Sequence, residues 1–346
     1  MYSHKNNDKQ ILYSLIFIGL LAGLFGHYFE TGKITFPNSN GINSAAAILA
    51  TEQNLTSTTP SLPLISLGFV GDIMLDRGVK KSVMNNMRGD YSKLFTNTEF
   101  LKTPDIMFAN LEGPASDQGI NRQNLYSFRM DPKSLIALKD SGIDVVSFAN
   151  NHVGDYGRLA FEDTLKRLRD IGILSCGAGM NRTEAETPAI VVQNNFKVGY
   201  LCFSDVGPAD MEATDSTSGI LLARNPRFDD IIKNAAEKVD ALIVSFHFGE
   251  EYKPIHNGPQ EALAKKAIND GAVMIVGHHP HVPQDIAYYD GKPVLYSLGN
   301  FIFDQYFSKE TMGGLFVTAT LIGTNVSNVT SHQITLNKNF VPHLAK

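Results

Sequence analysis

The segment AVMIVGHHPHV, residues 272–282, places three histidines directly after a short apolar run. Residues 272–276 are apolar and rich in β-branched side chains, which is typical of a buried strand. The histidines therefore follow the carboxyl end of a strand, where open α/β sheets place their ligand sites. Imidazole is the commonest metal-binding side chain, and Pro280 stiffens the backbone between the last two rings. The segment predicts a metal site at the end of a strand.

Composition limits the classes of function. The 346 residues are 43% hydrophobic, enough for one large domain or two ordinary ones. The net charge of −5 argues against a nucleic-acid groove and for a soluble body that does not bind anionic lipid. Cys176 and Cys202 lie in apolar runs, and we interpret them as two buried small hydrophobes. One disulfide remains the alternative if the domain lies outside the cytoplasm.

The segment before residue 64 predicts a membrane anchor and a linker. Residues 1–10 are polar, and residues 11–29 are apolar over about the length of a membrane-spanning helix. Basic residues precede this segment, so we expect a single-pass signal anchor in the cell (inner) membrane, with the C-terminal domain on the extracytoplasmic side. A cleaved signal peptide is the alternative. Residues 30–63 predict a flexible linker, and residues 64–346 the folded domain.

Apolar runs alternate with helical patterns along the folded domain, which predicts an α/β fold with much parallel pairing. Strands are expected at 64–70, 105–109, 143–149, 173–176, 189–192, 198–203, 241–246, 272–276, 285–289, 293–297, 315–321 and 330–336. Helical segments are expected up to residue 85 and at 91–101, 132–141, 156–171, 229–239 and 259–270.

Five of the expected strands end in side chains that commonly bind metal ions. In chain order these are Asp72, Glu112, Asn151 with His152, His247, and His279 with His281. A single Asp after a strand is usually a turn or cap residue, and a single His is more often an ordinary surface or core group. Five at equivalent positions indicate a shared cation, because burying unpaired carboxylates and imidazoles together is costly. The absence of thiolates suits Mn, Fe, Zn or Mg.

These ligand types suggest a hydrolytic centre with two divalent ions. Such ions share a bridging carboxylate and activate a water that attacks phosphorus or a carbonyl carbon. Glu112 is the natural bridge, since its carboxylate has two oxygens. His152, beside Asn151, is suited to protonate a leaving group or to hold the attacked oxygen.

Six segments between residues 64 and 304 extend this pattern. They are GDIMLDRG (71–78), NLEG (110–113), ANNHVGDYG (149–157), HFGEEY (247–252), GHHPHVPQ (277–284) and YSLGNF (296–301). In this order they resemble the CapA/PgsA family of poly-γ-glutamate capsule biosynthesis proteins, within the calcineurin-like metallophosphoesterase superfamily. The resemblance implies a four-layer fold, in which helices flank two packed mixed β-sheets. It also implies a membrane-tethered protein that works with membrane-embedded capsule synthase subunits in export, anchoring or trimming of the polymer.

The resemblance also assigns roles to individual residues. It implies one ion held by Asp72, Glu112 and His281. It implies a second ion held by Glu112, Asn151, His247 and His279. His152, together with Asp72, takes the catalytic role.

The sequence departs from the superfamily at the first motif. That motif is Asp-x-His, and Met74 occupies its third position here. Because one imidazole is missing, we expect the first ion to bind weakly or to recruit Asn110. Glu112 also replaces the usual aspartate. Asn110 and His278 are expected next to the ligands, where they orient them.

Two further residues are candidate substrate contacts. Arg77 is suited to bind a carboxylate or phosphate in a bidentate manner; its alternative is a salt bridge to Asp76 or Glu112. Asn300 follows a strand near the site, and its alternative is an ordinary turn residue.

The expected function is therefore that of a membrane-anchored capsule biosynthesis or export protein. Its divalent-metal hydrolase-type site would act on poly-γ-glutamate or on the attachment of that polymer. The alternative is a non-catalytic polymer-binding or assembly component of the synthase complex, with a degenerate metal site. A third interpretation is a secreted phosphoesterase unrelated to capsule.

Overall fold

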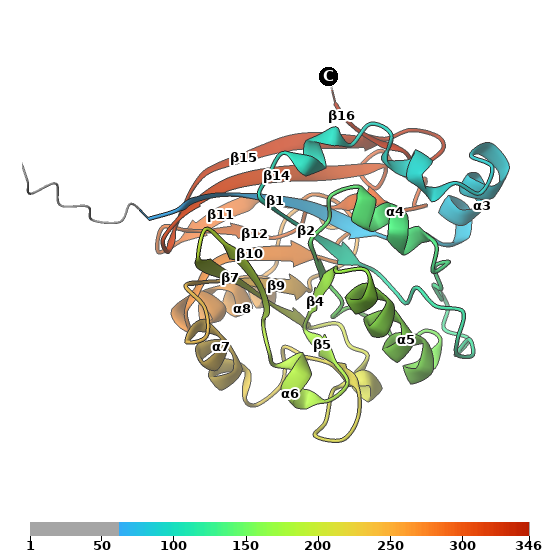
Figure 1. Ribbon diagram of the computed structural model, residues 1–346. Helices are drawn as coiled ribbons and strands as arrows, with labels where there is room; N and C mark the ends of the chain where they lie inside the picture. The colour runs from blue at the N-terminus through green and yellow to red at the C-terminus, as the bar shows by residue number, and fades with distance from the viewer. Residues whose placement is uncertain (1–61, 346) are drawn as a thin grey trace, which may run out of the picture. The chain divides into compact units, whose positions relative to one another are not determined.

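Strand β1 (Leu64–Ile73) runs through the middle of the larger of two sheets (Figure 1). The computed structural model describes residues 62–345. On one side of β1 lie three parallel strands: β2 (Ile106–Leu111), β3 (Val145–Ser147) and β4 (Leu174–Cys176). On the other side lie three strands in antiparallel order: β14 (Gly313–Ile322), β15 (Asn325–Leu336) and β16 (Pro342–Leu344). A short strand, β13 (Asn300–Ile302), pairs in parallel with the end of β1.

The smaller sheet has a parallel centre and antiparallel edges. Its strands, in spatial order, are β11 (Ile286–Tyr289), β12 (Lys292–Leu295), β10 (Ala272–His278), β9 (Ala241–His247), β7 (Phe196–Ser204) and β6 (Ala189–Gln193). The four inner strands are parallel to one another. Strands β5 (Ala178–Gly179) and β8 (Gly219–Ile220) form a separate two-stranded ladder.

Helices accompany both sheets. They are α3 (Arg77–Asn86), α4 (Ser134–Asp140), α5 (Gly157–Asp170), α6 (Arg182–Ala185), α7 (Phe228–Ala236) and α8 (Gly258–Asn269). Three 3₁₀ turns, η1 (Tyr91–Phe95), η2 (Glu99–Lys102) and η3 (Ala209–Met211), complete the described elements. Figure 1 shows α4 and α5 on the side of β2 and β4, whereas α7 and α8 lie beside β7 and β9.

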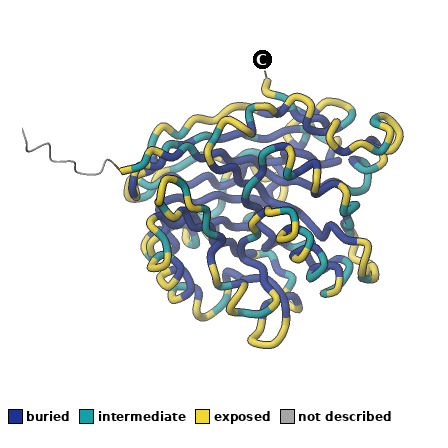
Figure 2. Tube along the Cα trace, viewed as in Figure 1, coloured by how far each residue is buried: buried dark blue, intermediate teal, exposed yellow. Residues whose placement is uncertain are grey.

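Two apolar cores hold these layers together. The first lies between the sheets, where Phe108 of β2 stacks on Tyr200 of β7 with ring centroids 5.3 Å apart. The second lies between the smaller sheet and its helices, where Phe228 of α7 packs on Phe203 and Phe246. Figure 2 shows the resulting pattern, with buried strands inside and exposed loops outside. Burial of these large side chains is the main force that stabilises the sheets against each other.

A disulfide joins the two sheets and corrects our interpretation of the cysteines as unpaired small hydrophobes. Cys176 at the end of β4 is bonded to Cys202 in β7, and their Cα atoms are 5.3 Å apart. Gly177 permits this approach, because a Cβ at that position would lie 2.0 Å from the carbonyl oxygen of Cys202. Closing a loop of 26 residues reduces the entropy of the unfolded chain, which in the chain-entropy picture is worth about 3.5 kcal/mol.

The α/β prediction is confirmed, and the differences lie at element ends and in short elements. β1 continues beyond residue 70 to Ile73, because β13 and β2 supply partners for its last residues. The helix expected at 91–101 is two separate 3₁₀ turns. β5, α6, β8, β13 and β16 have no counterpart among the expected elements, since each spans only two to four residues.

The predicted signal anchor at 11–29, with its flanking segments 1–10 and 30–61, lies outside the described residues. Among residues 62–345, no helix combines the length and the apolar character needed to cross a bilayer. The predicted domain boundaries and membrane topology therefore stay predictions.

Candidate metal centre

The strand register brings polar side chains from both sheets to one place. Asp72 of β1 lies opposite Asn110 of β2 and opposite Asn300 of β13. In the smaller sheet, His247 of β9 lies opposite His278 of β10. All five residues lie at the carboxyl ends of β1, β2, β9 and β10 or at the start of β13. Parallel strands thus gather their terminal side chains at one edge, as the sequence pattern predicts.

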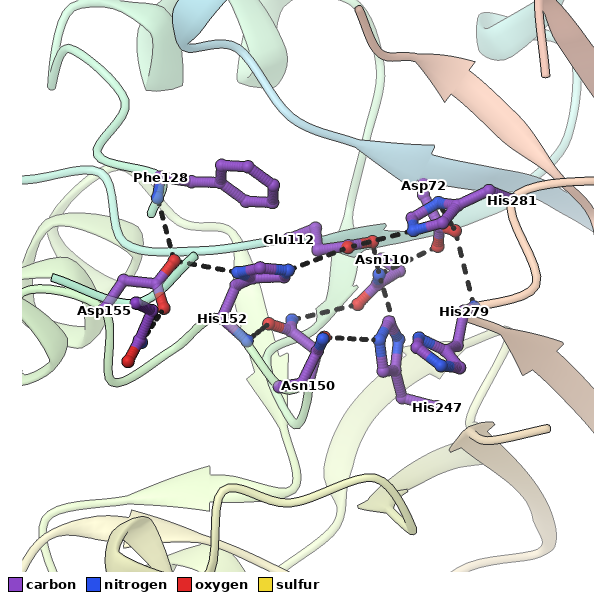
Figure 3. A network of polar contacts seen from close by, with 12 residues as sticks. Asp72, Asn110, Glu112, Phe128, Asn150, His152, Asp155, His247, His279 and His281 are labelled. Carbon is purple, nitrogen blue, oxygen red and sulfur yellow. Dashed lines mark hydrogen bonds and ion pairs between the residues drawn. The ribbon is translucent and has the colours of Figure 1, made fainter. Parts of the chain in front are cut away.

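Two fully buried carboxylates form the centre of this cluster (Figure 3). Asn110 Nδ2 donates to Asp72 Oδ1 at 2.9 Å and to Glu112 Oε2 at 3.2 Å. His281 Nδ1 lies 3.3 Å from Asp72 Oδ2, and its Nε2 lies 3.7 Å from Glu112 Oε1. Glu112 Oε1 itself has no hydrogen-bond partner among residues 62–345. A carboxylate oxygen buried without a donor is costly, and a bound cation would satisfy it.

The donor set fits a divalent cation. One ligand atom from each of Asp72, Glu112 and His281 lies within 4.8 Å of the other two. Two carboxylates with one imidazole, and no thiolate, suit Mn, Fe, Zn or Mg. The unpartnered Glu112 Oε1 is the observation that a cation explains directly, because it is the one oxygen of the buried pair to which nothing in the described chain donates.

The residues predicted for the second ion also lie together. His247 Nε2 lies 2.9 Å from Asn151 Oδ1, and the rings of His247 and His279 have centroids 4.8 Å apart. His279 is only 6% exposed, and its Nδ1 has no hydrogen-bond partner in the described part of the chain. The structure thus places all six predicted ligands in one cluster, while their assignment to two separate ions stays a prediction.

The protein environment sets the charges of the cluster before any metal binds. Burial lowers the pKa of His247 well below its usual range and that of His279 to about 3, so both imidazoles are neutral. Burial also raises the pKa of Glu112 well above its usual range. Although burial disfavours a charged imidazole, Glu112 and Asp72 raise the pKa of His281 to about 9. His281 is therefore protonated at neutral pH.

Asp72 is the carboxylate that remains ionised. Burial alone would raise its pKa, but the contacts with His278 and His281 outweigh burial and hold the pKa well below the usual range. His278 Nδ1 lies 3.2 Å from Asp72 Oδ1, and this imidazole is almost fully buried. His278 therefore contacts the predicted ligand Asp72, and its role in orienting the ligands stays a prediction.

His152 lies at the edge of the cluster and is held in one orientation. Its Nδ1 lies 2.8 Å from Asp155 Oδ2, and its ring packs against Phe128 with centroids 3.9 Å apart. Asp155 also accepts a hydrogen bond from the backbone N–H of Phe128 at 2.8 Å. With Nδ1 engaged by Asp155, Nε2 faces Glu112 Oε1 at 3.9 Å (Figure 3). This arrangement suits proton transfer at Nε2.

Met74, at the position of the missing histidine, does not point a ligand into the cluster. Its side chain is fully buried with Phe128 and Phe303, and its sulfur accepts a hydrogen bond from the backbone N–H of Asp76. Asn110 does not replace the imidazole, contrary to one expectation. Its amide nitrogen faces the carboxylates, while its oxygen accepts from Asn150 Nδ2 at 3.2 Å. Asn110 thus orients the carboxylates.

A cavity of about 260 Å³ opens beside the cluster and is lined by His152 and His281. Arg77 also lines it, and its partner is Asp304, so the alternative of a salt bridge to Asp76 or Glu112 is wrong, while the predicted substrate contact stays a prediction. Arg77 Nε and Nη2 donate to the two oxygens of Asp304 at 3.1 and 2.5 Å. The guanidinium also lies 5.0 Å from the centre of the Phe128 ring.

Asn300 has a structural role in this structure. Its Oδ1 lies 3.0 Å from His281 Nδ1, and its Nδ2 donates to Gln305 and to the backbone oxygen of Thr311. All its hydrogen-bonding groups are therefore engaged within the protein, and Asn300 orients His281. The predicted substrate contact stays a prediction, whereas the alternative of a mere turn residue does not fit this network.

The loop that carries the histidines has an unusual backbone. His279 has φ +98° and His281 has φ +59°, which are conformations that side chains other than glycine rarely adopt. Such strain persists only where the surroundings fix the backbone, and it often occurs at functional sites.

Several residues of the site were not predicted from the sequence. Asp155, Asn150 and Asp304 position His152, Asn110 and Arg77 respectively, and Glu251 lines the cavity. Asp155 was detectable, because it stands three residues after His152. Asp304 gave no signal, because it lies 227 residues from Arg77.

Comparison with known proteins agrees with the resemblance seen in the motifs. The family model described as bacterial capsule synthesis protein PGA_cap matches residues 66–305. The PGA biosynthesis protein CapA of Bacillus subtilis is 34% identical over 250 residues, which cover 71% of this chain and 65% of the relative. The capsule biosynthesis protein CapA of Bacillus anthracis is 34% identical over 253 residues, covering 70% of this chain and 60% of the relative. The chain thus spans less than two thirds of these relatives.

Solved structures with a similar arrangement share little sequence. A hypothetical protein of Thermus thermophilus gives a TM-score of 0.48 at 17% identity, covering 78% of this chain and 98% of that one. A phosphatase of Mycoplasma pneumoniae gives a TM-score of 0.47 at 15% sequence identity, and the match covers 79% of this chain and 94% of that one. A calcineurin-like phosphoesterase of Bacillus subtilis gives a TM-score of 0.42 at 16% sequence identity, and the match covers 80% of this chain and 91% of that one.

Proposed function

Because this chain belongs to the PGA_cap family of bacterial capsule synthesis proteins, we propose that it is a membrane-anchored protein of poly-γ-glutamate capsule biosynthesis or export. We further propose that its site is a divalent-metal hydrolase centre that acts on the polymer or on its attachment. The observation that carries the hydrolase proposal is the buried, unpartnered Glu112 Oε1 beside Asp72 and His281. The two mixed sheets with their helices support the four-layer, metallophosphoesterase-like fold implied by the motifs.

The ligand side chains would hold the cations as the motif resemblance implies. Asp72, Glu112 and His281 would hold one ion. Glu112, Asn151, His247 and His279 would hold the second. When bound, divalent ions supply electrophilic stabilisation and a water of lowered pKa. Asn110 donates to both Asp72 and Glu112, and it would thereby hold the two carboxylates in place for the first ion.

His152 would manage the proton of the leaving group. In hydrolysis, water adds to the carbonyl carbon or phosphorus, and the bond to the leaving nitrogen or oxygen breaks. That leaving atom needs a proton, and His152 lines the cavity while Asp155 engages its Nδ1 and leaves Nε2 available. The Asp155 carboxylate fixes the orientation of the ring, so that Nε2 is the nitrogen available to the leaving atom.

The cavity beside the cluster has groups that suit a glutamate polymer. Each residue of poly-γ-glutamate carries one free α-carboxylate, attached directly to a main chain that contains two methylene groups per residue. Arg77 Nη1 makes no hydrogen bond within residues 62–345, because Asp304 engages only Nε and Nη2. It is therefore free to donate to a substrate carboxylate. Phe128 and Tyr252 supply apolar lining at the same cavity.

His152 provides the test of the enzymatic proposal. We expect His152→Ala to lower the rate of poly-γ-glutamate hydrolysis by about 10²–10⁴-fold, which is the usual contribution of a general acid. Metal content should not change, because His152 is not among the proposed ligands. The measurement is release of glutamate oligomers by the full chain, followed by chromatography. His256→Ala is the matched control, since His256 also pairs with an aspartate, Asp285, but does not line the cavity.

Met74 favours a second candidate, a non-catalytic polymer-binding or assembly component. The buried contact of Met74 with Phe128 and Phe303 occupies the position of the missing ligand. This candidate predicts no hydrolysis by the wild-type chain and a normal amount of capsule in a His152→Ala strain. Loss of capsule in that strain, together with hydrolysis by the purified wild-type chain, would eliminate it.

We also propose that the described domain lies on the extracytoplasmic side of the cell membrane, near the synthase subunits. The Cys176–Cys202 disulfide supports this location, because structural disulfides persist in oxidising compartments. Protease added to cells with a permeabilised envelope should remove the domain while cytoplasmic proteins stay intact. Full protection of the domain would contradict the proposed location.

A further inference from the structure

We infer that Glu251, a residue outside the ligand set given above, is an additional ligand of the metal centre. One oxygen of its carboxylate and one ring nitrogen from each of His279 and His281 lie within 4.8 Å of one another. Glu251 also lines the cavity beside the cluster. The inference rests on the proposed metal centre, and it adds an anionic ligand from the solvent side.

The loop that carries Glu251 is fixed to the histidine loop. The backbone N–H of Tyr252 donates to the carbonyl oxygen of Pro280 at 2.8 Å, so residue 251 lies beside the segment that joins the two histidines. The Tyr252 ring packs on His281 with centroids 6.1 Å apart. Gln284 Nε2 donates to the carbonyl oxygen of Lys253 at 2.9 Å. These contacts hold the backbone that follows Glu251 close to the segment that carries the histidines.

One of the two buried histidines in this group, His279, has a ring nitrogen without a hydrogen bond. His279 is only 6% exposed, and its Nδ1 has no partner among residues 62–345. An unpartnered, buried imidazole beside an exposed carboxylate is what a shared cation would bridge.

Glu251 would also supply a ligand in place of the histidine that is missing at position 74. The ion held by Asp72, Glu112 and His281 lacks one ligand, because Met74 packs into an apolar contact with Phe128 and Phe303. Glu251 reaches the same histidine, His281, from the opposite loop. An exposed side chain can adjust its position more readily than the buried ligands can. A carboxylate in place of an imidazole shifts the donor set toward oxygen, which favours Mn²⁺ or Mg²⁺ over softer ions.

Its neighbour in sequence, Glu250, supplies a matched control. Both glutamates are exposed, but Glu250 does not line the cavity, and its Oε1 lies 3.5 Å from Asn257 Nδ2. Glu250→Gln therefore makes the same change of charge and shape one residue away.

The test is titration of the metal-free full chain in detergent with Mn²⁺, followed by calorimetry. We expect Glu251→Gln to weaken the binding of one ion at least tenfold, while Glu250→Gln binds as the wild type does. Glu251→Asp keeps the charge but shortens the side chain, so it should also bind more weakly. The melting temperature without metal should stay unchanged in all three variants, because both side chains are exposed.

The possible outcomes distinguish an error in the role of Glu251 from an error in the proposed metal centre. Equal affinities in wild type and Glu251→Gln would overturn the role of Glu251 while leaving the metal centre intact. A different outcome is that Glu251→Asp binds Mn²⁺ as tightly as the wild type while only Glu251→Gln binds more weakly. That result would show that the charge of Glu251 acts through space, and it would also overturn the role of Glu251 as a ligand. Absence of Mn²⁺ binding in the wild type itself would reject the proposed metal centre.

Discussion

Glu112→Gln is expected to abolish tight metal binding and, at the same time, to stabilise the metal-free protein. The glutamine keeps the shape of the side chain but cannot supply the anionic oxygen that has no partner in the buried cluster. Loss of a residue that merely supports a ligand costs about 10–100-fold in affinity. Loss of the central carboxylate should cost more than about 100-fold.

The gain in stability follows from the raised pKa of Glu112. Burial, with help from Asp72 and Glu251, raises the pKa of Glu112 in the folded protein well above its usual range. For an acid of this kind, the unfolded chain loses its proton at a lower pH than the folded chain does. The free energy of unfolding therefore falls as pH rises from about 4.5 toward the folded-state pKa. A neutral glutamine removes that loss at neutral pH.

Both effects can be measured on the same samples. Thermal melting with and without Mn²⁺ should show a higher melting temperature for metal-free Glu112→Gln and no increase when Mn²⁺ is added. The wild type should show the increase. Equal Mn²⁺-induced shifts in the two proteins would contradict the placement of Glu112 at the centre of the site. Glu250→Gln, which removes an exposed charge, should follow the wild type.

Gly71→Ala is expected to have the largest effect on the fold. A Cβ at this position would lie 1.8 Å from the carbonyl oxygen of Gly299, where no flexible side chain can move away. The same carbonyl accepts a hydrogen bond from the backbone N–H of Asp72 at 2.9 Å. The methyl group must push β13 away from β1, which breaks this bond and displaces Asp72. We expect a loss of about 3 kcal/mol or more in the free energy of unfolding.

Gly258→Ala is the matched control for this substitution. Gly258 begins α8, and a Cβ there would have no neighbouring atom within 4 Å. Its effect should lie within about 0.5 kcal/mol of zero, or should be slightly stabilising, since alanine is the better helix former. Denaturant unfolding of the full chain compares the two. Similar stabilities for both alanine variants would show that β13 does not approach β1 as described.

Much of the site was predictable because parallel strands impose their own geometry. The apolar runs before Asp72 and His279 indicated buried strands, and parallel pairing then required their carboxyl ends to meet. The alternation of runs with helical patterns likewise indicated the α/β class. Elements such as β13 were not predictable, since three residues are too few to show a period.

The remaining features depend on contacts between distant parts of the chain. Cys176 and Cys202 show no pairing signal, because only the packing of one sheet on the other brings their Cα atoms within reach. The contact between Arg77 and Asp304 has the same origin. Glu250 and Glu251 are the same residue type next to each other in the sequence, and only the folded structure shows that Glu251 alone lines the cavity.

Anomalous diffraction at the manganese edge, from crystals grown with Mn²⁺, tests the proposed centre most directly. We predict a strong anomalous peak between Asp72, Glu112 and His281, with a second peak next to His279. Saturating Mn²⁺ that gives no peak among these residues, or only peaks at surface carboxylates, would contradict the metal centre.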